Sequence, residues 1–221
     1  MGTAELLLIF TWGVYFALHS LFAGHAFKRY ILAKLPRLAP CYRLAYNLVA
    51  LLTLLPIAWI HLTFTAEPAW QWHGVVKTAA EILALLALLG FFWSLKYYDM
   101  RAFTGIATCL GRHTDSSADK FTISPLHRLV RHPWYLFGLI LVWSRNQDSL
   151  TLISSIMVTL YLFTGSRLEE RKLLRDFGDV YRHYMERVPG IIPRPWKRLS
   201  AAEAERLSRP GPTERSDPPS G

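Results

Sequence analysis

Long, almost uninterrupted apolar segments dominate the pattern of hydrophobic and polar positions along the chain. A helix needs about 20 mostly apolar residues to cross a bilayer. Four segments come close to this length or reach it with their flanking residues: 6–22, 44–62, 75–95 and 150–163. A fifth, 134–143, is short, so it either extends into its flanks or is a partly re-entrant arm. The pattern predicts an all-α, polytopic membrane protein with about five transmembrane helices.

Basic residues are distributed unevenly among the segments that connect these spans. Five Lys and Arg residues lie between the first and second spans, six lie between the third and fourth, and twelve follow the last. Only Lys77 and Arg145 fall on the opposite side of a five-span arrangement. Because Lys- and Arg-rich segments stay in the cytoplasm, we expect these two loops and the C-terminal segment there. The N-terminus then lies outside.

The composition agrees with a membrane protein of one domain. Of the 221 residues 52% are hydrophobic, which is too apolar for a soluble fold of this size. The formal net charge of +9 then belongs to a cytoplasmic surface facing anionic lipid, and we expect no nucleic-acid partner. Cys41 and Cys109 fall in predicted cytoplasmic loops, where thiols stay reduced. Neither has the spacing of a metal ligand, so we expect no metal site.

Motifs of soluble nucleotide-binding folds are absent from the sequence. The 13 glycines never fall two residues apart, so the chain has no Gly-x-Gly turn for a dinucleotide. Any cofactor must be held by helix ends and loops. Beyond residue 198 the chain is mostly Ala, Glu, Arg, Ser and Pro, which predicts a membrane domain over 1–198 and a disordered cytoplasmic tail over 199–221.

The densest group of charged and aromatic residues begins at the short apolar segment 134–143, with Arg-His-Pro-Trp-Tyr at 131–135. Pro133 suits the first turn of a helix, because its backbone angle is already helical and it lacks a donor that would go unpaired there. The amides of the next three residues, as far as Leu136, would carry the positive end of the helix dipole, where a carboxylate could dock. His132 could bind at the same place, or it could cap the helix while Arg131 reaches lipid phosphate.

A pair of carboxylates, Glu169 and Glu170, closes the last span. Spacings of three and four residues put the following set on one face of the continuing helix: Arg167, Glu170, Leu174, Phe177, Tyr181 and Tyr184. Gly178 could interrupt this helix. The carboxylates could be solvated and paired with nearby basic residues. However, acidic groups at a membrane exit are costly unless they are paired or functional, which favours a functional role.

These residues, together with Val-Pro-Gly-Ile-Ile-Pro at 188–193, resemble integral-membrane S-adenosylmethionine-dependent methyltransferases related to isoprenylcysteine carboxyl methyltransferase and phospholipid N-methyltransferase. The resemblance covers about residues 121–195. It implies a cytoplasmic, C-terminal helical lid and S-adenosylmethionine as the cofactor. The residues that it puts at the cofactor are His127, His132, Pro133, Tyr135, Leu136, Glu169, Tyr181 and Tyr184.

Two positions depart from the pattern of that family. Many members have Gly-Pro-Tyr ahead of the Arg-His-Pro, where this chain has Ser-Pro-Leu-His, ending on His127. Members usually have a glycine after the tyrosine, where this chain has Leu136. We therefore expect the contact at His127 and the substrate end of the site to differ from those of the family.

The resemblance implies methyl transfer by in-line displacement, which depends mainly on positioning and on exclusion of water. Arg167 and Glu170 are the catalytic candidates. If the acceptor is a carboxylate, Arg167 could hold it; if it is a thiol or an amine, Glu170 is the candidate base. The apolar flanks of the site favour a lipidic or small apolar acceptor that arrives from the bilayer.

A second, shorter resemblance points to another class of function, the haem-linked membrane accessory proteins of nitric oxide reduction and ζ-carotene isomerase. A histidine inside the bilayer can ligate haem. His19 could instead be hydrogen-bonded to a neighbouring helix. A scaffold without chemistry is a third hypothesis. The residues that carry this resemblance are His19, Ser20, Tyr42, Arg43, Tyr46 and Asn47.

The charge distribution makes the topology testable with reporter fusions in cells. A reporter that functions only in the cytoplasm should be active when fused after Lys197 and inactive when inserted at Trp70, since 23 of the 25 basic residues lie in the predicted cytoplasmic segments. A reporter that functions only outside should give the reverse result. The same signal at both positions would contradict the five-span arrangement.

Overall fold

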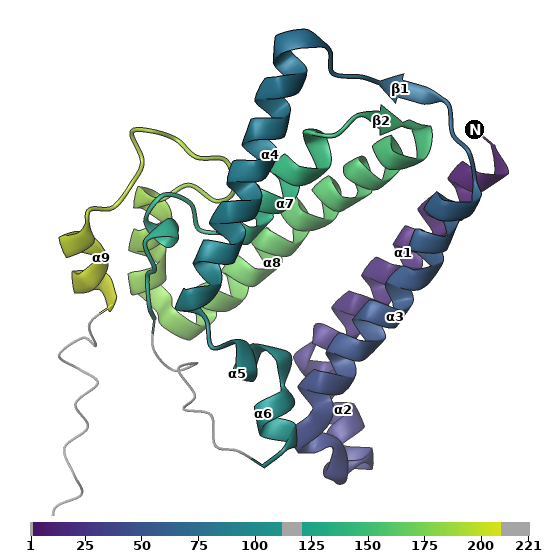
Figure 1. Ribbon diagram of the computed structural model, residues 1–221. Coiled ribbons are helices and arrows are strands. Elements are labelled where there is room, and N and C mark those ends of the chain that lie inside the picture. The colour runs from purple at the N-terminus through teal and green to yellow at the C-terminus, as the bar shows by residue number, and fades with distance from the viewer. Residues whose placement is uncertain (1, 112–120, 209–221) are drawn as a thin grey trace, which may run out of the picture. The chain divides into compact units, whose positions relative to one another are not determined.

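The computed structural model of the chain describes residues 2–111 and 121–208. Helices form almost all of the regular structure in these ranges, which confirms the prediction of an all-α, polytopic protein (Figure 1). In chain order the elements are α1 (Thr3–Ala23), α2 (His25–Lys34), η1 (Pro36–Cys41), α3 (Tyr42–Thr63), β1 (Pro68–Trp70), α4 (Gly74–Ser94), η2 (Leu95–Tyr97), α5 (Met100–Thr104), α6 (Ile106–Cys109), η4 (Leu126–Arg128), α7 (Pro133–Trp143), β2 (Gln147–Asp148), α8 (Ser149–Arg187) and α9 (Ala201–Ser208).

Four helical segments are long and apolar enough to cross a membrane: Thr3–Ala23, Pro36–Thr63, Gly74–Tyr97 and Ser149–Arg187. They contain the four long spans predicted from the sequence. The fifth predicted span corresponds to α7, which has 11 residues. At 1.5 Å per residue α7 is about 16 Å long, roughly half of the apolar thickness of a bilayer. A fifth full span therefore stays a prediction.

The surfaces of the long helices are strongly apolar. Leu62 is 87% exposed and Val75 is 85% exposed. In the apolar window of Gly74–Tyr97 only 6% of the residues are buried within the chain. Such a surface is favourable against lipid and unfavourable against water. The chain is therefore an integral membrane protein.

The chain divides into two compact units, and each unit is made of two chain segments. The first contains residues 1–114 and 137–162, and the second contains residues 115–136 and 163–221. Both α7 and α8 begin in one unit and end in the other. The apolar core of the first unit is formed by α1, α3 and the start of α8, through Leu8, Trp12, Ile57, Ile60 and Leu150.

His19 is held by a neighbouring helix of the first unit. The Tyr46 hydroxyl lies 2.7 Å from His19 Nε2, and the ring of Tyr15 stacks on the imidazole at a centroid distance of 5.5 Å. This hydrogen bond joins α1 to α3. It agrees with the interpretation of His19 as a satisfied histidine between helices.

The sequence pattern missed a short two-stranded ribbon in the first unit. β1 pairs with β2 in antiparallel orientation, with Pro68 opposite Asp148 and Trp70 opposite Gln147. Next to it, the Ser149 amide donates to the Glu67 carbonyl at 3.0 Å. Strands of two or three residues are too short to show a period-two pattern, so only the folded chain reveals this pairing.

The two cysteines form a disulfide bond between η1 and α6. The prediction of two reduced thiols is therefore wrong for this structure. The residues lie 68 positions apart in the sequence, but α6 folds back against η1 so that their Cα atoms are 4.3 Å apart. Such proximity cannot be read from sequence spacing.

Residues 199–208 are ordered, in contrast to the disordered tail expected from composition. Leu199 is buried, and its backbone amide and carbonyl are hydrogen-bonded to Arg128 at 3.0 and 3.1 Å. Ser200 and Glu203 then form a reciprocal capping box at the start of α9, with distances of 3.2 and 2.8 Å. The Ser-x-x-Glu spacing of this capping box is a local signal for a helix start, which composition alone does not register. Residues 209–221 lie outside the described part of the chain.

Gly105 makes the junction between α5 and α6 possible. Its φ of +79° lies in the left-handed region, which favours glycine because other residues meet a clash of their Cβ atom there. A Cβ at this position would also come within 2.8 Å of both the Arg43 side chain and the Leu44 amide. The close approach of this turn to the start of α3 therefore requires glycine.

We expect Gly105→Ala to destabilise the first unit by about 1–3 kcal/mol, the usual cost of a strained backbone conformation, with the clash against α3 in addition. Thermal unfolding in detergent would measure this loss. Gly74→Ala is the matched control, because Gly74 also has a positive φ but has nothing within 4 Å of an added Cβ. Equal effects of the two substitutions would show that the contact with α3 is unimportant.

Candidate functional site

The site begins where residues 131–132 pair with the chain that follows α8. The Arg131 amide donates to the Pro189 carbonyl at 2.9 Å, and the His132 amide donates to the Gly190 carbonyl at 3.0 Å. α7 then starts at Pro133, as predicted. These backbone bonds join two segments of the second unit that lie nearly 60 residues apart in the sequence.

The Arg131 side chain links this pairing to α8. Its Nε and Nη2 atoms lie 2.8 and 2.7 Å from Glu170 Oε1. Its Nη1 atom donates to the carbonyls of Met185, at 3.0 Å, and Val188. The guanidinium is therefore an internal clamp and does not serve as the lipid anchor that one interpretation of the sequence suggested.

His132 lies between the two predicted carboxylates. Its Nε2 atom is 3.0 Å from Glu170 Oε1, and its Nδ1 atom is 3.5 Å from Glu169 Oε2. The ring stacks on Tyr135, whose hydroxyl donates to Glu169 Oε2 at 3.1 Å. A neutral imidazole can donate to only one of the carboxylates, whereas a protonated one can donate to both.

The two carboxylates have different surroundings. The Glu170 side chain is 12% exposed, and its Oε1 accepts from both Arg131 and His132. The Glu169 side chain is 49% exposed. A buried charge with several donors is fixed in place, since loss of one partner leaves the other charge uncompensated. Glu170 is thus engaged within the chain, and Glu169 is the carboxylate that a ligand can reach.

Beyond the carboxylates, α8 is interrupted at Gly178, where φ is 53° and ψ is −128°. This break was expected from the sequence. The helical turns after it carry Tyr181 and Tyr184, which are 2% and 3% exposed. Both rings pack against Phe121, at centroid distances of 5.8 and 5.4 Å. The two tyrosines are therefore part of the core of the second unit, and the prediction of a lid over a cofactor stays open.

His127 lies in η4, where the family often has a tyrosine. Burial, and then the positive charge of His132, lower the pKa of His127 from 6.5 to about 4. Its Nδ1 atom lies 2.7 Å from the Ser124 hydroxyl, and its backbone carbonyl accepts a hydrogen bond from the Tyr184 hydroxyl at 2.6 Å. His127 is therefore a neutral, half-buried histidine at ordinary pH.

Two cavities of the second unit are lined by Arg131. One, of about 270 Å³, is aromatic and weakly charged, and His127, His132, Glu169, Tyr181 and Tyr184 contribute to its wall. The other, of about 320 Å³, contains most of the nearby cations. Its charged lining residues are Arg131, Arg167, Glu170, Arg194 and Lys197. Five of the eight predicted cofactor residues thus line the first cavity, whereas Pro133, Tyr135 and Leu136 do not. Both catalytic candidates line the second.

One predicted contact is not available in the structure, and three residues of the cavities were not predicted. The Leu136 amide donates to the His132 carbonyl at 3.1 Å, so it is used inside the first turn of α7 and is not offered to a carboxylate. Arg131, Arg194 and Lys197 were not among the candidates. An acidic pair at a membrane exit needs basic partners, and this requirement could have pointed to Arg131.

The fold and this cluster define a class of protein, a polytopic helical membrane protein with a polar, charge-lined site built from helix ends and loops. Three of its relatives are named methanethiol S-methyltransferase. The one from Bradyrhizobium diazoefficiens, numbered 2, is 31% identical over 88% of this chain and 75% of its own length. The one from Mycobacterium tuberculosis is 28% identical over 88% of this chain and 80% of its own length. The one from Pseudomonas deceptionensis is 26% identical over 79% of this chain and 67% of its own length.

No protein-family model and no solved structure matches the chain. The chain nevertheless belongs to the family of integral-membrane methyltransferases, related to isoprenylcysteine carboxyl methyltransferase, that contains these enzymes. It is therefore a methyltransferase, as the motif resemblance implied. The relatives favour this function over the haem-linked alternative.

The lowered pKa of His127 predicts a loss of stability in mild acid. Between pH 6.5 and about 4 the unfolded chain binds a proton at His127 that the folded chain does not, so stability should fall as the pH drops through this window. Thermal unfolding of the wild type and of His127→Gln at pH 7.5 and 5.0 would measure the effect. The substitution should reduce the acid-induced loss, and the exposed His183→Gln should not. An identical pH dependence in all three proteins would contradict the prediction.

Proposed function

We propose that this protein transfers the methyl group of S-adenosylmethionine to methanethiol or another small apolar thiol, at a site that opens to the cytoplasm. The observation that supports this most is the pair of cavities lined by Arg131, in a chain whose relatives are methanethiol S-methyltransferases. One cavity suits a cationic, aromatic donor and the other suits an anionic acceptor. The cytoplasmic orientation rests on the distribution of basic residues.

The aromatic cavity fits the chemistry of the donor. S-adenosylmethionine carries a sulfonium, an ammonium, a carboxylate and an adenine ring, and when bound it supplies an electrophilic methyl group. The accessible carboxylate of Glu169 can pair with positive charge, and the half-buried rings of Phe121 and Phe177 can offer faces to a cation or to adenine. Arg131 and His132 can donate to a carboxylate. We assign Glu169, His132 and Tyr135 to the donor side.

The basic cavity fits a thiol acceptor. The thiolate is the reactive nucleophile, and nearby cations lower the pKa of a thiol. Arg167 and Lys197 line this cavity together with Arg194 and Arg131. We therefore assign Arg167 to stabilisation of the thiolate. The proton of the thiol leaves to solvent when the thiolate forms.

Methyl transfer then needs no further base. The thiolate sulfur forms a bond to the methyl carbon as the carbon–sulfonium bond breaks, and the electron pair of that bond returns to the donor sulfur as a neutral thioether. With methanethiol as acceptor the products are dimethyl sulfide and S-adenosylhomocysteine. Because Glu170 Oε1 already accepts from Arg131 and His132, we assign Glu170 to positioning rather than to proton removal.

The test is an assay of the purified protein in lipid nanodiscs with S-adenosylmethionine and methanethiol, with gas-chromatographic detection of dimethyl sulfide. We expect Glu169→Gln to weaken S-adenosylmethionine binding by about 1–2 kcal/mol, or roughly 5- to 30-fold. Arg167→Ala should instead raise the KM for the thiol, shift the activity profile to higher pH and leave donor binding unchanged.

Asp176→Asn and Arg171→Ala are the matched controls, since both residues are exposed on α8 and line neither cavity. They should retain wild-type binding and activity. The absence of product from methanethiol and other small thiols, with S-adenosylmethionine bound, would refute the proposed acceptor. Wild-type donor affinity in Glu169→Gln would refute the proposed donor site.

A further inference from the structure

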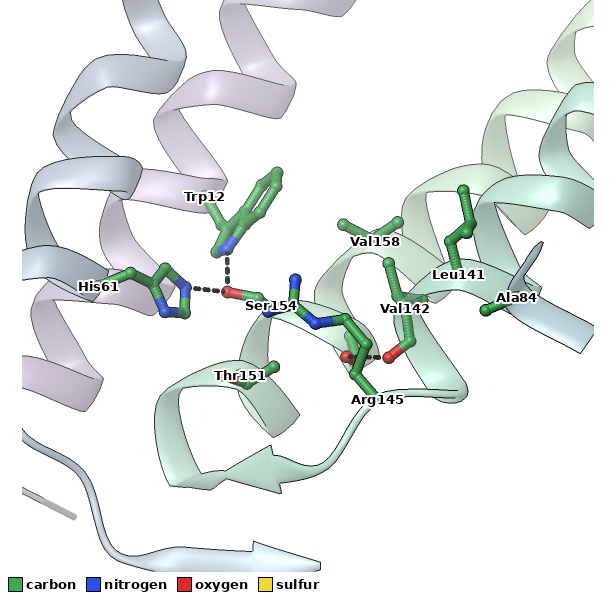
Figure 2. A pocket seen from close by; sticks show the side chains of 10 residues that line it. Trp12, His61, Ala84, Leu141, Val142, Arg145, Thr151, Ser154 and Val158 are labelled. Carbon is green, nitrogen blue, oxygen red and sulfur yellow. Dashed lines mark hydrogen bonds between the residues drawn. The ribbon is translucent and has the colours of Figure 1, made fainter. Parts of the chain in front are cut away.

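A separate cavity of about 710 Å³ lies within the first unit. Its wall is contributed by α1, α3, α4, α7 and α8, and by the turn between the last two (Figure 2). None of its lining residues lines either cavity of the second unit. Its volume is far larger than a thiol with two heavy atoms requires. The proposed methyl transfer therefore leaves this cavity without a role.

Polar groups gather at the part of the cavity nearest the turn. The Ser154 hydroxyl accepts a hydrogen bond from Trp12 Nε1 at 2.9 Å and lies 2.9 Å from His61 Nε2. Figure 2 shows these two bonds, with the Arg145 side chain extending toward Ser154. Thr151 lies one turn earlier on α8 and also lines the cavity. A guanidinium, an imidazole and hydroxyls thus occur together, a set that suits a phosphate group.

The rest of the wall is apolar. Ala84 of α4, Leu141 and Val142 of α7, and Val158 of α8 line it. Water gains no hydrogen bonds from such a surface, and an empty cavity destabilises the fold in proportion to its volume. An apolar chain in this space would remove both costs.

The position of Arg145 suggests where such a ligand comes from. It lies two residues after the end of α7, and it is one of only two basic residues outside the three segments predicted to be cytoplasmic. In that topology Arg145 lies on the outer side of the membrane domain, in the turn that leads into β2, which pairs with β1 of the segment between α3 and α4. A cation there, at the rim of an apolar cavity, complements a phosphate with attached acyl chains.

We propose that this cavity binds one anionic phospholipid, with its phosphate at Arg145, His61 and the hydroxyls of Thr151 and Ser154. One acyl chain lies against Leu141, Val142 and Val158. The bound lipid joins helices α1 and α3 to α4, α7 and α8 within the first unit. The proposal does not depend on the reaction that the second unit carries out.

The test compares three probes added to delipidated protein in detergent: phosphatidylglycerol, diacylglycerol and inorganic phosphate. Native mass spectrometry counts the retained lipids, and thermal unfolding reports stabilisation. We expect one phosphatidylglycerol per chain, with a rise in Tm, while diacylglycerol binds at least about tenfold more weakly because it lacks the charge-assisted contacts. Inorganic phosphate should give no shift, because it lacks the acyl chains.

Variants locate the binding site. Arg145→Ala should weaken phosphatidylglycerol binding about tenfold, and Ala84→Phe should block the acyl chain and prevent retention. Lys77→Ala is the matched control, because Lys77 is the other basic residue on the predicted outer side and does not line the cavity. It should bind like the wild type.

Several results would overturn the proposal. Equal stabilisation by inorganic phosphate would make the cavity a phosphate site rather than a lipid site. Equal binding of diacylglycerol, or wild-type binding by Arg145→Ala, would show that the cation has no role. If Ala84→Phe fails to fold, the comparison of phosphatidylglycerol binding between Arg145→Ala and Lys77→Ala still tests the proposal. Methyl transfer is assayed separately, so failure of one proposal does not affect the other.

Discussion

The second unit depends on the compensation of one partly buried charge, the carboxylate of Glu170, whose side chain is 12% exposed. A carboxylate with so little access to water is stable only when opposite charge and hydrogen-bond donors surround it. Arg131 and His132 supply these partners. The same guanidinium also binds the carbonyls of Met185 and Val188. The arginine that compensates the charge of Glu170 therefore also holds the end of α8 and the segment after it against the segment before α7.

This arrangement lets a charged site form without a nucleotide-binding sheet. Backbone pairing of residues 131–132 with 189–190 replaces the rigid loop that a Gly-rich turn would provide. The break of α8 at Gly178 then lets Tyr181 and Tyr184 pack against Phe121. An accessible carboxylate, aromatic rings and a basic cavity are left around the ion pair. The proposed donor site uses the carboxylate and the aromatic rings, and the proposed acceptor site uses the basic cavity.

The membrane sets the second constraint. Apolar side chains can cover the outside of the spans, but each polar group inside must find a partner, because lipid offers none. Trp12, His61 and Ser154 meet this need in the first unit by bonding to one another. Within residues 2–111 and 121–208, every buried side-chain nitrogen or oxygen has a hydrogen-bond partner. Polar groups of this kind join the helices in the same way that His19 joins α1 to α3.

The sequence alone determined the four long helices, the start of α7 at Pro133 and the break at Gly178, because helix length, proline and glycine act locally. It also drew attention to His132 and the two glutamates, whose charge at a membrane exit needs an explanation. Only the tertiary structure decided that Arg131 clamps Glu170, that Cys41 meets Cys109, that β1 pairs with β2 and that Leu199 is buried. Each of these contacts joins residues far apart in the sequence, and periodicity and composition carry no information about which distant segments meet.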